Sequence, residues 1–392
     1  MSQAENTLST GVHMFAGAGG MAIGLRNAGF HHSRLYEYDV HAYATLRGNG
    51  LLSLGVNDWD EHKGDVRKVD WSRIPQPVDL LAGGVPCQPF SLAGKHLAQR
   101  DGRNMFPEFF RAAEQLRPLG MFIENVAGLL REAFRPYFEY ILRRLEFPSL
   151  SPRPEELWED HDLRIRQHQN SDGYSPEYNV TWTPLDAADY GVPQNRKRVL
   201  IVATRADFPT FSFPAPTHSR AALILAQESG IYWERHGIAP LSNITHRPRL
   251  HSDDRLPWVT VRDAIGNLPA PASTEGEAEK NHWSIPGARS YHGHTGSKLD
   301  WPSKTLKAGV NGVPGGENTV VTDAGEIRYY TFREAARIQT FPDTHFFHGA
   351  RKHITRQIGN AVPCLLSEVV ARPLNDLLTS AAPSDTQEQP NA

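Results

Sequence analysis

Short apolar runs alternate with helical segments over residues 10–206, and this alternation constrains the fold more than any other feature of the chain. Such a strand–helix order is typical of a parallel sheet with helices on both faces. We therefore predict an α/β fold with a mostly parallel, doubly wound sheet. The expected strands are 12–15, 35–39, 78–82, 121–123 and 198–203, and the expected helices are 21–28, 104–116, 134–145, 331–339 and 361–378.

Composition divides the chain into four parts. Residues 10–206 carry the alternating pattern, whereas 207–300 are rich in Pro, Gly, Ser and His and show weak helical periodicity. Helical pattern returns in 301–380, and 381–392 form a polar, low-complexity tail that we expect to be disordered. We predict that 207–300 form a smaller, irregular second domain and that 301–380 re-enter the first.

The composition argues against several classes of protein. The chain has two cysteines in 392 residues and no CxxC pair, which disfavours a disulfide framework or a structural zinc site. We expect no secretory signal, because the first residues lack a basic segment and an apolar run, and no apolar stretch reaches the ~20 residues that span a bilayer. We expect a cytoplasmic protein with no membrane or metal partner. Because the net charge is −3, any contact with nucleic acid must come from local basic clusters.

A glycine-rich turn after the first expected strand has the spacing of a nucleotide-binding loop. Gly17, Gly19 and Ala22 satisfy GxGxx(G/A). Glu37 ends the next expected strand, where a carboxylate can bind ribose hydroxyls. Asp65 follows a third expected strand, where an acid could accept from an adenine amino group. The pattern fits a nucleotide-like cofactor and leaves NAD and S-adenosylmethionine open, with a tight helix-packing turn as the structural alternative.

Three further segments place reactive or charged side chains at strand ends. Cys87 follows an apolar run and a Gly-Gly pair, at the edge where open α/β sheets bind ligands. Glu124 and Asn125 follow another apolar run. Arg196 and Arg198 share one face of an extended segment, and two guanidiniums there suit a phosphate or a base carbonyl. Taken singly, each segment has a structural alternative: a packed thiol, an exposed strand tip and a solvated charge run.

These segments follow one another in a definite order. They are Phe15-Ala-Gly-Ala-Gly-Gly20, Glu37-Tyr-Asp39, Gly64-Asp65-Val66, Gly84-Val-Pro-Cys-Gln-Pro-Phe-Ser91, Glu124-Asn-Val126, Gln194-Asn-Arg-Lys-Arg198, Arg333-Glu-Ala-Ala-Arg-Ile-Gln339, Phe341-Pro-Asp343 and Gln357-Ile-Gly-Asn360. In this order they resemble the C5 cytosine-specific DNA methyltransferases of bacterial restriction–modification systems. The resemblance covers about 11–372, apart from 147–173 and about 207–300. Two departures are His13, where the family usually has Asp, and the insert 147–173, which we expect on the surface.

The resemblance implies a Rossmann-like, S-adenosylmethionine-dependent methyltransferase domain and a target-recognition domain. Cys87 would add to C6 of a flipped-out cytosine, Glu124 would hold or donate a proton at N3, and Arg198 would bind O2. Asn125 would fix the exocyclic edge of the base or the backbone near Cys87, and Arg196 belongs to the same expected catalytic group. The expected cofactor-binding residues are Phe15, Gly17, Gly19, Gly20, Glu37, Tyr38, Asp65, Val66, Pro86 and Asn360.

The resemblance also implies the partners. Double-stranded DNA would be read by 207–300, a mobile loop at 88–103 would close over the flipped base, and 301–307 would be the return hinge and a DNA-backbone contact. We expect a monomer that shares its system with a cognate restriction endonuclease without contacting it. The candidates for contacts to phosphate or guanine are Arg247, Arg249, Arg255 and Arg262.

Three other functions compete with this interpretation. An NAD-dependent oxidoreductase would use the glycine turn and Glu37, but it leaves Cys87 and Glu124 unexplained. A methyltransferase of the same family acting on transfer RNA shares the catalytic segments, although the irregular segment 207–300 favours a domain that reads DNA. A DNA-binding protein without catalysis is disfavoured because Cys87, Glu124 and Arg198 occur together.

Overall fold

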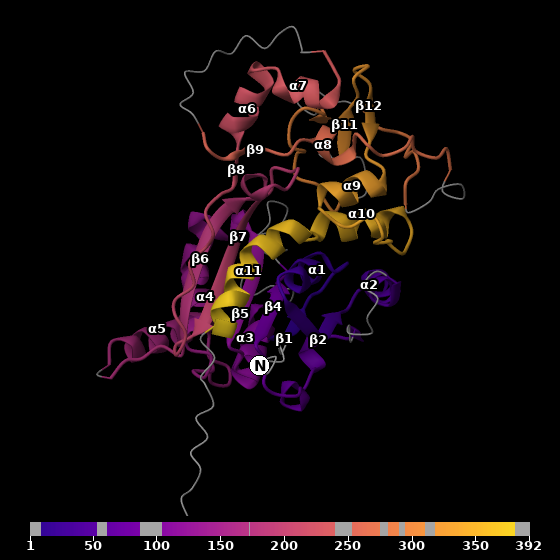
Figure 1. Ribbon diagram of the computed structural model, residues 1–392. Coiled ribbons are helices and arrows are strands. Elements are labelled where there is room, and N and C mark those ends of the chain that lie inside the picture. Colours follow the sequence, from indigo (N-terminus) through magenta and orange to yellow (C-terminus); the bar gives the residue numbers. More distant parts are fainter. Residues whose placement is uncertain are drawn as a thin grey trace, which may run out of the picture.

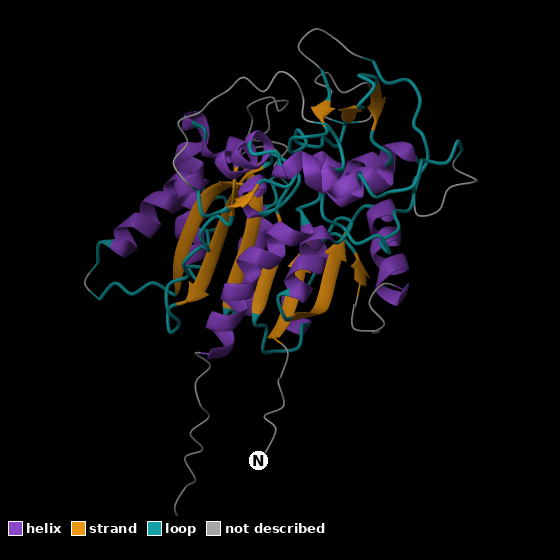
Figure 2. Cartoon of the chain, turned by 45° about the horizontal axis from the view of Figure 1, so that its top comes forward, coloured by secondary structure: helices purple, strands orange, loops and turns teal. Residues whose placement is uncertain are grey.

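A seven-stranded sheet with helices on both faces forms the larger part of the molecule (Figures 1 and 2). Its strand order is β3-β2-β1-β4-β5-β7-β6. The strands are β1 (Ser9–Met14), β2 (Phe30–Glu37), β3 (Glu61–Lys63), β4 (Leu80–Gly84), β5 (Gly120–Val126), β6 (Tyr178–Asp186) and β7 (Lys197–Arg205). This computed structural model describes residues 9–52, 61–86, 104–171, 173–239, 253–274, 281–289, 295–309 and 318–380.

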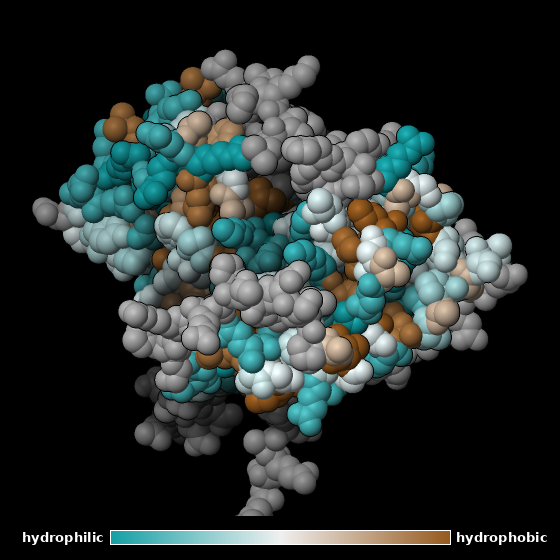
Figure 3. All heavy atoms as spheres, turned by 90° about the horizontal axis from the view of Figure 1, so that it is seen from above, coloured by the Kyte–Doolittle hydropathy of each residue, from teal (hydrophilic) through white to brown (hydrophobic). Residues whose placement is uncertain are grey.

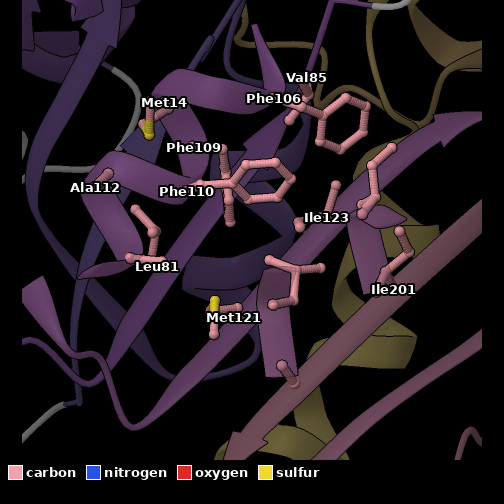
Figure 4. Packing of buried hydrophobic residues seen from close by; sticks show 14 of the residues in the cluster. Met14, Leu81, Val85, Phe106, Phe109, Phe110, Ala112, Met121, Ile123 and Ile201 are labelled. Atoms are coloured by element: carbon pink, nitrogen blue, oxygen red, sulfur yellow. The ribbon is translucent and has the colours of Figure 1, made fainter. Parts of the chain in front are cut away.

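Apolar side chains on both faces of the sheet form the core. Because successive residues of a strand point to opposite faces, Leu81 and Ile201 pack towards α3 and α4, whereas Leu80 and Leu200 pack towards α1 and α11. Figure 4 shows the first of these clusters, where α3 side chains meet those of β4 and β5. The helices are α1 (Gly20–Asn27), α3 (Phe106–Leu116), α4 (Arg135–Glu146) and α11 (Cys364–Ser380).

Strand β7 runs opposite to its neighbour β5, while β1, β2, β3, β4 and β5 pair in parallel. The start of β7 therefore lies at the same edge of the sheet as the carboxyl ends of the parallel strands. There Arg198 is the register partner of Val126, the last residue of β5. The predicted fold class, a mostly parallel α/β sheet covered on both faces, is confirmed.

Beyond residue 207 the chain forms short elements that lie above the sheet in Figure 1. Leu223, Tyr232 and Trp233 form a small apolar cluster of their own, with Trp258 and Trp301 packed against it. The elements are β8 (His218–Ser219), α6 (Arg220–Glu228), α7 (Ile231–His236), β9 (Leu256–Pro257), α8 (Val261–Ile265), β10 (Ser297–Lys298), β11 (Thr319–Val321) and β12 (Ile327–Tyr329). Two helices, α9 (Phe332–Ile338) and α10 (Arg351–Asn360), lead back to α11.

The insert 147–173 lies mostly on the surface, as expected, but one face of it packs on the core. It contains helix α5 (Trp158–Gln169), and the side chain of Ile165 is fully buried in the main core. Asp162 of the same helix pairs with Arg143 of α4, with 2.6 Å between the Oδ1 and Nε atoms. Periodicity did not reveal α5 because its buried face is partly polar. Helix α2 (Val40–Leu52) and α10 were also not predicted, and none of the described helices could cross a membrane.

Candidate active site

A cavity of about 490 Å³ opens where the parallel strands β1, β2, β4 and β5 end. Most of the predicted site residues line it, because the carboxyl ends of parallel strands meet at one edge of the sheet. Gly19 lies just before α1 and is not among the lining residues, and Cys87 lies outside the described residues although its neighbour Pro86 lines the cavity. The predicted residues in the lining are Phe15, Gly17, Gly20, Glu37, Tyr38, Asp65, Val66, Pro86, Glu124, Asn125, Arg196, Arg198 and Asn360.

The glycine turn brings the start of α1 to the cavity. Gly17 and Gly19 have φ angles of 57° and 90°, a left-handed conformation that glycine adopts without steric cost. A Cβ atom on Gly20 would lie 2.3 Å from the Val362 carbonyl oxygen, so only glycine permits this approach. No described side chain caps the N-terminus of α1. Gly20 and Met21 line the cavity, so the positive end of the helix dipole faces it and suits a polar or anionic ligand group.

Glu37 holds the glycine turn against the end of β2. Its Oε2 accepts a hydrogen bond from the Gly17 N–H at 2.7 Å, and its Oε1 accepts one from the Asp39 N–H at 2.6 Å. Burial raises the pKa of Glu37, and these backbone hydrogen bonds oppose the rise. The carboxylate is thus fixed at the cavity wall.

Asp65 is already engaged by a neighbouring side chain. Its Oδ1 accepts from the Arg67 backbone N–H at 3.1 Å and from the Arg67 Nε at 2.8 Å. These bonds hold the pKa of Asp65 below its usual value, chiefly through the Arg67 side chain. Arg67 also lines the cavity, and 54% of its side chain is exposed, so a ligand can displace it or share the carboxylate with it.

Glu124 and Arg198 form a shielded ion pair at the cavity wall. The Arg198 Nε and the Glu124 Oε1 lie 2.6 Å apart, and the two side chains are only 11% and 9% exposed. Beside them, the Asn125 Nδ2 donates to the Val85 carbonyl at 3.2 Å. Asn125 therefore fixes the backbone two residues before Cys87, while the ion pair presents a carboxylate and a guanidinium to the cavity.

Arg196 and Arg198 both line the cavity, but their guanidiniums contact different partners. Arg196 directly precedes β7. Its buried NH2 donates to the carbonyls of Gly359 at 3.1 Å and Ala361 at 2.9 Å. Arg196 thus holds the end of α10, whereas Arg198 contacts Glu124.

Among the four arginines expected to contact DNA, Arg262 is bound elsewhere. Its guanidinium pairs with Asp300 at 2.6 Å and with Asp323 at 2.5 Å, and its side chain is 11% exposed. Arg255 pairs with Asp253 but remains 46% exposed. The structure therefore favours a structural role for Arg262, while Arg247 and Arg249 lie outside the described residues.

The cavity also has lining residues that the sequence interpretation did not single out. Arg356 of α10 pairs with Asp39 after β2, and both residues line the cavity. His13, the departure from the family pattern, is buried on β1 and lines the cavity too. A signal for Arg356 existed, because it directly precedes the matching segment that ends at Asn360.

We expect His345 to make the protein less stable in acid. The ring is 1% exposed, hydrogen-bonded to the Ala18 backbone, and stacked on Phe341, and burial lowers its pKa to about 3. In the unfolded chain, histidine takes up a proton near pH 6.5. The contribution of neutral His345 to the free energy of unfolding is therefore complete above that pH. It decreases by about 1.4 kcal/mol per pH unit as the pH falls towards 3. Urea unfolding of the wild type and His345→Gln at pH 7 and pH 5 measures this loss.

In the His345→Gln variant, the decrease between pH 7 and pH 5 should be smaller by about 2 kcal/mol. Any packing defect of the variant cancels, because it contributes equally at both pH values. An unchanged decrease would show that another group carries the acid sensitivity.

The chain belongs to the C-5 cytosine-specific DNA methylase family, whose model matches residues 9–148 and 162–376. It is 34% identical over 385 residues to the Type II methyltransferase M.Eco47II of Escherichia coli, covering 95% of this chain and 80% of that protein. It is 32% identical over 369 residues to M.NgoMIV of Neisseria gonorrhoeae, covering 93% and 96%. The solved structure of S. pombe Dnmt2 methyltransferase shares the fold, with a TM-score of 0.55, 16% identity and coverage of 95% and 99%.

These similarities confirm the family that the order of the motifs predicted, and they make the protein a methyltransferase. They also exclude the NAD-dependent oxidoreductase that the glycine turn and Glu37 left open.

Proposed function

We propose that the protein transfers a methyl group from S-adenosylmethionine to C5 of a flipped-out cytosine in a specific double-stranded DNA sequence. The observation that carries the proposal is the Glu124–Arg198 ion pair, which lies at the wall of one cavity together with Pro86 and the glycine turn. An acid and a cation thus line the same cavity as the residue that precedes Cys87, which supports a role for both in binding one base.

The cavity fits S-adenosylmethionine in size and in chemistry. Its volume lies within the range of ~300–1,000 Å³ that is usual for ligand sites. The uncapped start of α1 suits the carboxylate of the methionine part. The rings of Phe15 and Tyr38 would contact the adenine. The Glu37 carboxylate would bind the ribose hydroxyls, and Asp65 would accept a hydrogen bond from the adenine amino group. The remaining contacts would come from Gly17, Gly19, Gly20, Val66, Pro86 and Asn360.

The proposed catalysis begins with the thiolate of Cys87, which forms a bond to C6 of the cytosine and makes C5 electron-rich. Glu124 holds or donates the proton at N3, and Arg198 binds O2, so both stabilise the charge that the addition puts into the ring. Bound S-adenosylmethionine would supply an electrophilic methyl group: C5 bonds the methyl carbon as its bond to the sulfonium sulfur breaks, which leaves S-adenosylhomocysteine. Loss of the C5 proton then restores the ring, and the electrons released break the bond to Cys87.

Two residues support this arrangement without acting on the base. Asn125 holds the Val85 carbonyl, and through it the chain that leads to Cys87. Arg196 holds the end of α10. We therefore place Arg196 among the positioning residues, and keep Glu124 and Arg198 as the charged groups that contact cytosine.

Residues 207–300 are proposed to read the DNA sequence, with Arg255 as the described candidate for a phosphate contact. Figure 3 looks down on the end of the molecule where these residues lie, and both hydrophilic and hydrophobic side chains border a recess in the middle of this face. The relatives are Type II methyltransferases, so we propose a role in a restriction–modification system. We also propose that the enzyme is cytoplasmic and monomeric, and that it does not contact its cognate endonuclease.

Two measurements test the proposed function. Methylation-sensitive sequencing of DNA from cells that express the chain should find 5-methylcytosine at one short sequence. A duplex of that sequence with 5-fluorocytosine at the target should form a covalent complex with the protein, because fluorine cannot leave as the C5 proton does. A complex with transfer RNA carrying the same base, and none with the duplex, would instead assign the transfer RNA alternative.

A further inference from the structure

Two buried glutamines join the segment 301–307 to the wall of the cavity. The Gln194 Oε1 accepts a hydrogen bond from the Leu306 N–H at 2.9 Å, and the Gln194 Nε2 donates to the Gln339 Oε1 at 3.0 Å. Gln339 in turn donates to the Ile358 carbonyl of α10 at 2.6 Å. Both glutamine side chains are fully buried, so loss of the Gln194–Leu306 or Gln194–Gln339 bond would leave a buried polar atom without its partner.

The backbone of the same segment is hydrogen-bonded to the residues that lead into β7. The Asn195 N–H donates to the Ser303 carbonyl at 2.8 Å, and the Ser303 N–H donates to the Pro193 carbonyl at 2.9 Å. On the other side, a Cβ atom on Gly359 would lie 2.4 Å from the Ala308 backbone nitrogen. The end of α10 therefore packs directly on this backbone.

Arg196 completes the connection. It donates to the Leu306 carbonyl at 3.4 Å as well as to the carbonyls of Gly359 and Ala361, on either side of Asn360. Gly359, Asn360 and Ala361 line the cavity, whereas no described residue of 301–309 does. A displacement of the segment must therefore shift the cavity wall or break buried hydrogen bonds.

We propose that Gln194 and Gln339 are positioning residues that couple the cavity to the segment returning from residues 207–300. A ligand that orders the end of α10 stabilises the hydrogen bonds of 303–307. Because coupling between two sites is reciprocal, DNA that orders this segment increases the affinity for the ligand. The inference rests on the proposed function, because it takes S-adenosylmethionine as the ligand and 207–300 as the DNA-reading part.

Hydrogen exchange with saturating S-adenosylhomocysteine, the unreactive analogue, tests the coupling. In the wild type, the ligand should slow exchange at 14–21, a segment that includes cavity-lining residues. It should also slow exchange by roughly tenfold at 303–307, which do not line the cavity. Slower exchange at 14–21 without slower exchange at 303–307 would overturn the coupling, but it would still support the proposed cofactor. No slowing at 14–21 would overturn the proposed cofactor, and this inference with it.

The Gln194→Met variant should lose most of the slowing at 303–307 and keep the slowing at 14–21. Gln339→Met serves the same purpose if the first variant does not fold. Asn49→Leu is the matched control, because it removes a buried amide of α2 that exchanges hydrogen bonds with the Phe346 backbone. It should lose stability but keep the wild-type response at 303–307. A wild-type response in Gln194→Met would refute the role of the glutamines.

Discussion

A Cys87→Ser variant is expected to transfer methyl groups at least ~1,000-fold more slowly than the wild type, with cofactor binding nearly unchanged. The reason is nucleophilicity: a thiolate forms at accessible pH, whereas a serine hydroxyl stays protonated and reacts poorly with C6. Transfer of a labelled methyl group to DNA measures the loss, and calorimetry with S-adenosylhomocysteine measures binding. The covalent complex with 5-fluorocytosine should also disappear.

The second cysteine gives the control for this experiment. Cys364 is 2% exposed, packs in an apolar cluster, and has its pKa raised by burial, so it is not a nucleophile. Cys364→Ala should therefore keep methyl transfer within a few-fold of the wild type and show at most a loss of stability. Activity of Cys87→Ser within tenfold of the wild type would remove Cys87 from the mechanism.

A Glu124→Gln variant is expected to lower kcat by ~100- to 10,000-fold, the range usual for a general acid or base. Glutamine keeps the size of the side chain and an oxygen near Arg198, but it cannot hold the proton at N3. Single-turnover methyl transfer measures the chemical step. Affinity for DNA and for the cofactor should change much less than kcat, which separates a chemical role from a binding role.

Loss of a buried ion pair could by itself unfold part of the protein, so a second shielded pair serves as control. Asp162 of α5 pairs with Arg143 of α4, with side-chain exposures of 8% and 16%, and neither residue lines the cavity. Asp162→Asn should lose stability but keep methyl transfer. If Asp162→Asn and Glu124→Gln lose activity equally, the effect of Glu124 is one of stability and not of chemistry.

Much of the site could be predicted from the sequence because strands β1, β2, β4 and β5 run in parallel. Glu37, Pro86 and Glu124 each come at or just after the end of an apolar run, and parallel strands bring such positions to one edge. The glycine turn was predictable for a related reason, since Gly17 and Gly19 adopt a backbone conformation that few other residues tolerate.

The insert 147–173 could not be predicted in the same way. Helix α5 buries His161 and Asp162 together with Ile165, and polar residues on a buried face hide the helical repeat. His161 is satisfied by the Tyr140 hydroxyl and the Leu150 carbonyl, partners that only the folded chain supplies. Burial of this kind depends on contacts distant in sequence, and local periodicity does not contain them.

The sequence alone determined the strand–helix order, the nucleotide-type turn and the succession of motifs that defines the family, because these depend on local patterns. The tertiary structure decided which charged groups meet. Arg198 reaches Glu124 only because β7 runs antiparallel to β5, which brings the start of one strand beside the end of the other. Arg196, two residues earlier, donates instead to carbonyls at the end of α10, which lie more than 160 residues later in the sequence. Strand direction and long-range hydrogen bonds are properties of the packed chain, and residue spacing does not encode them.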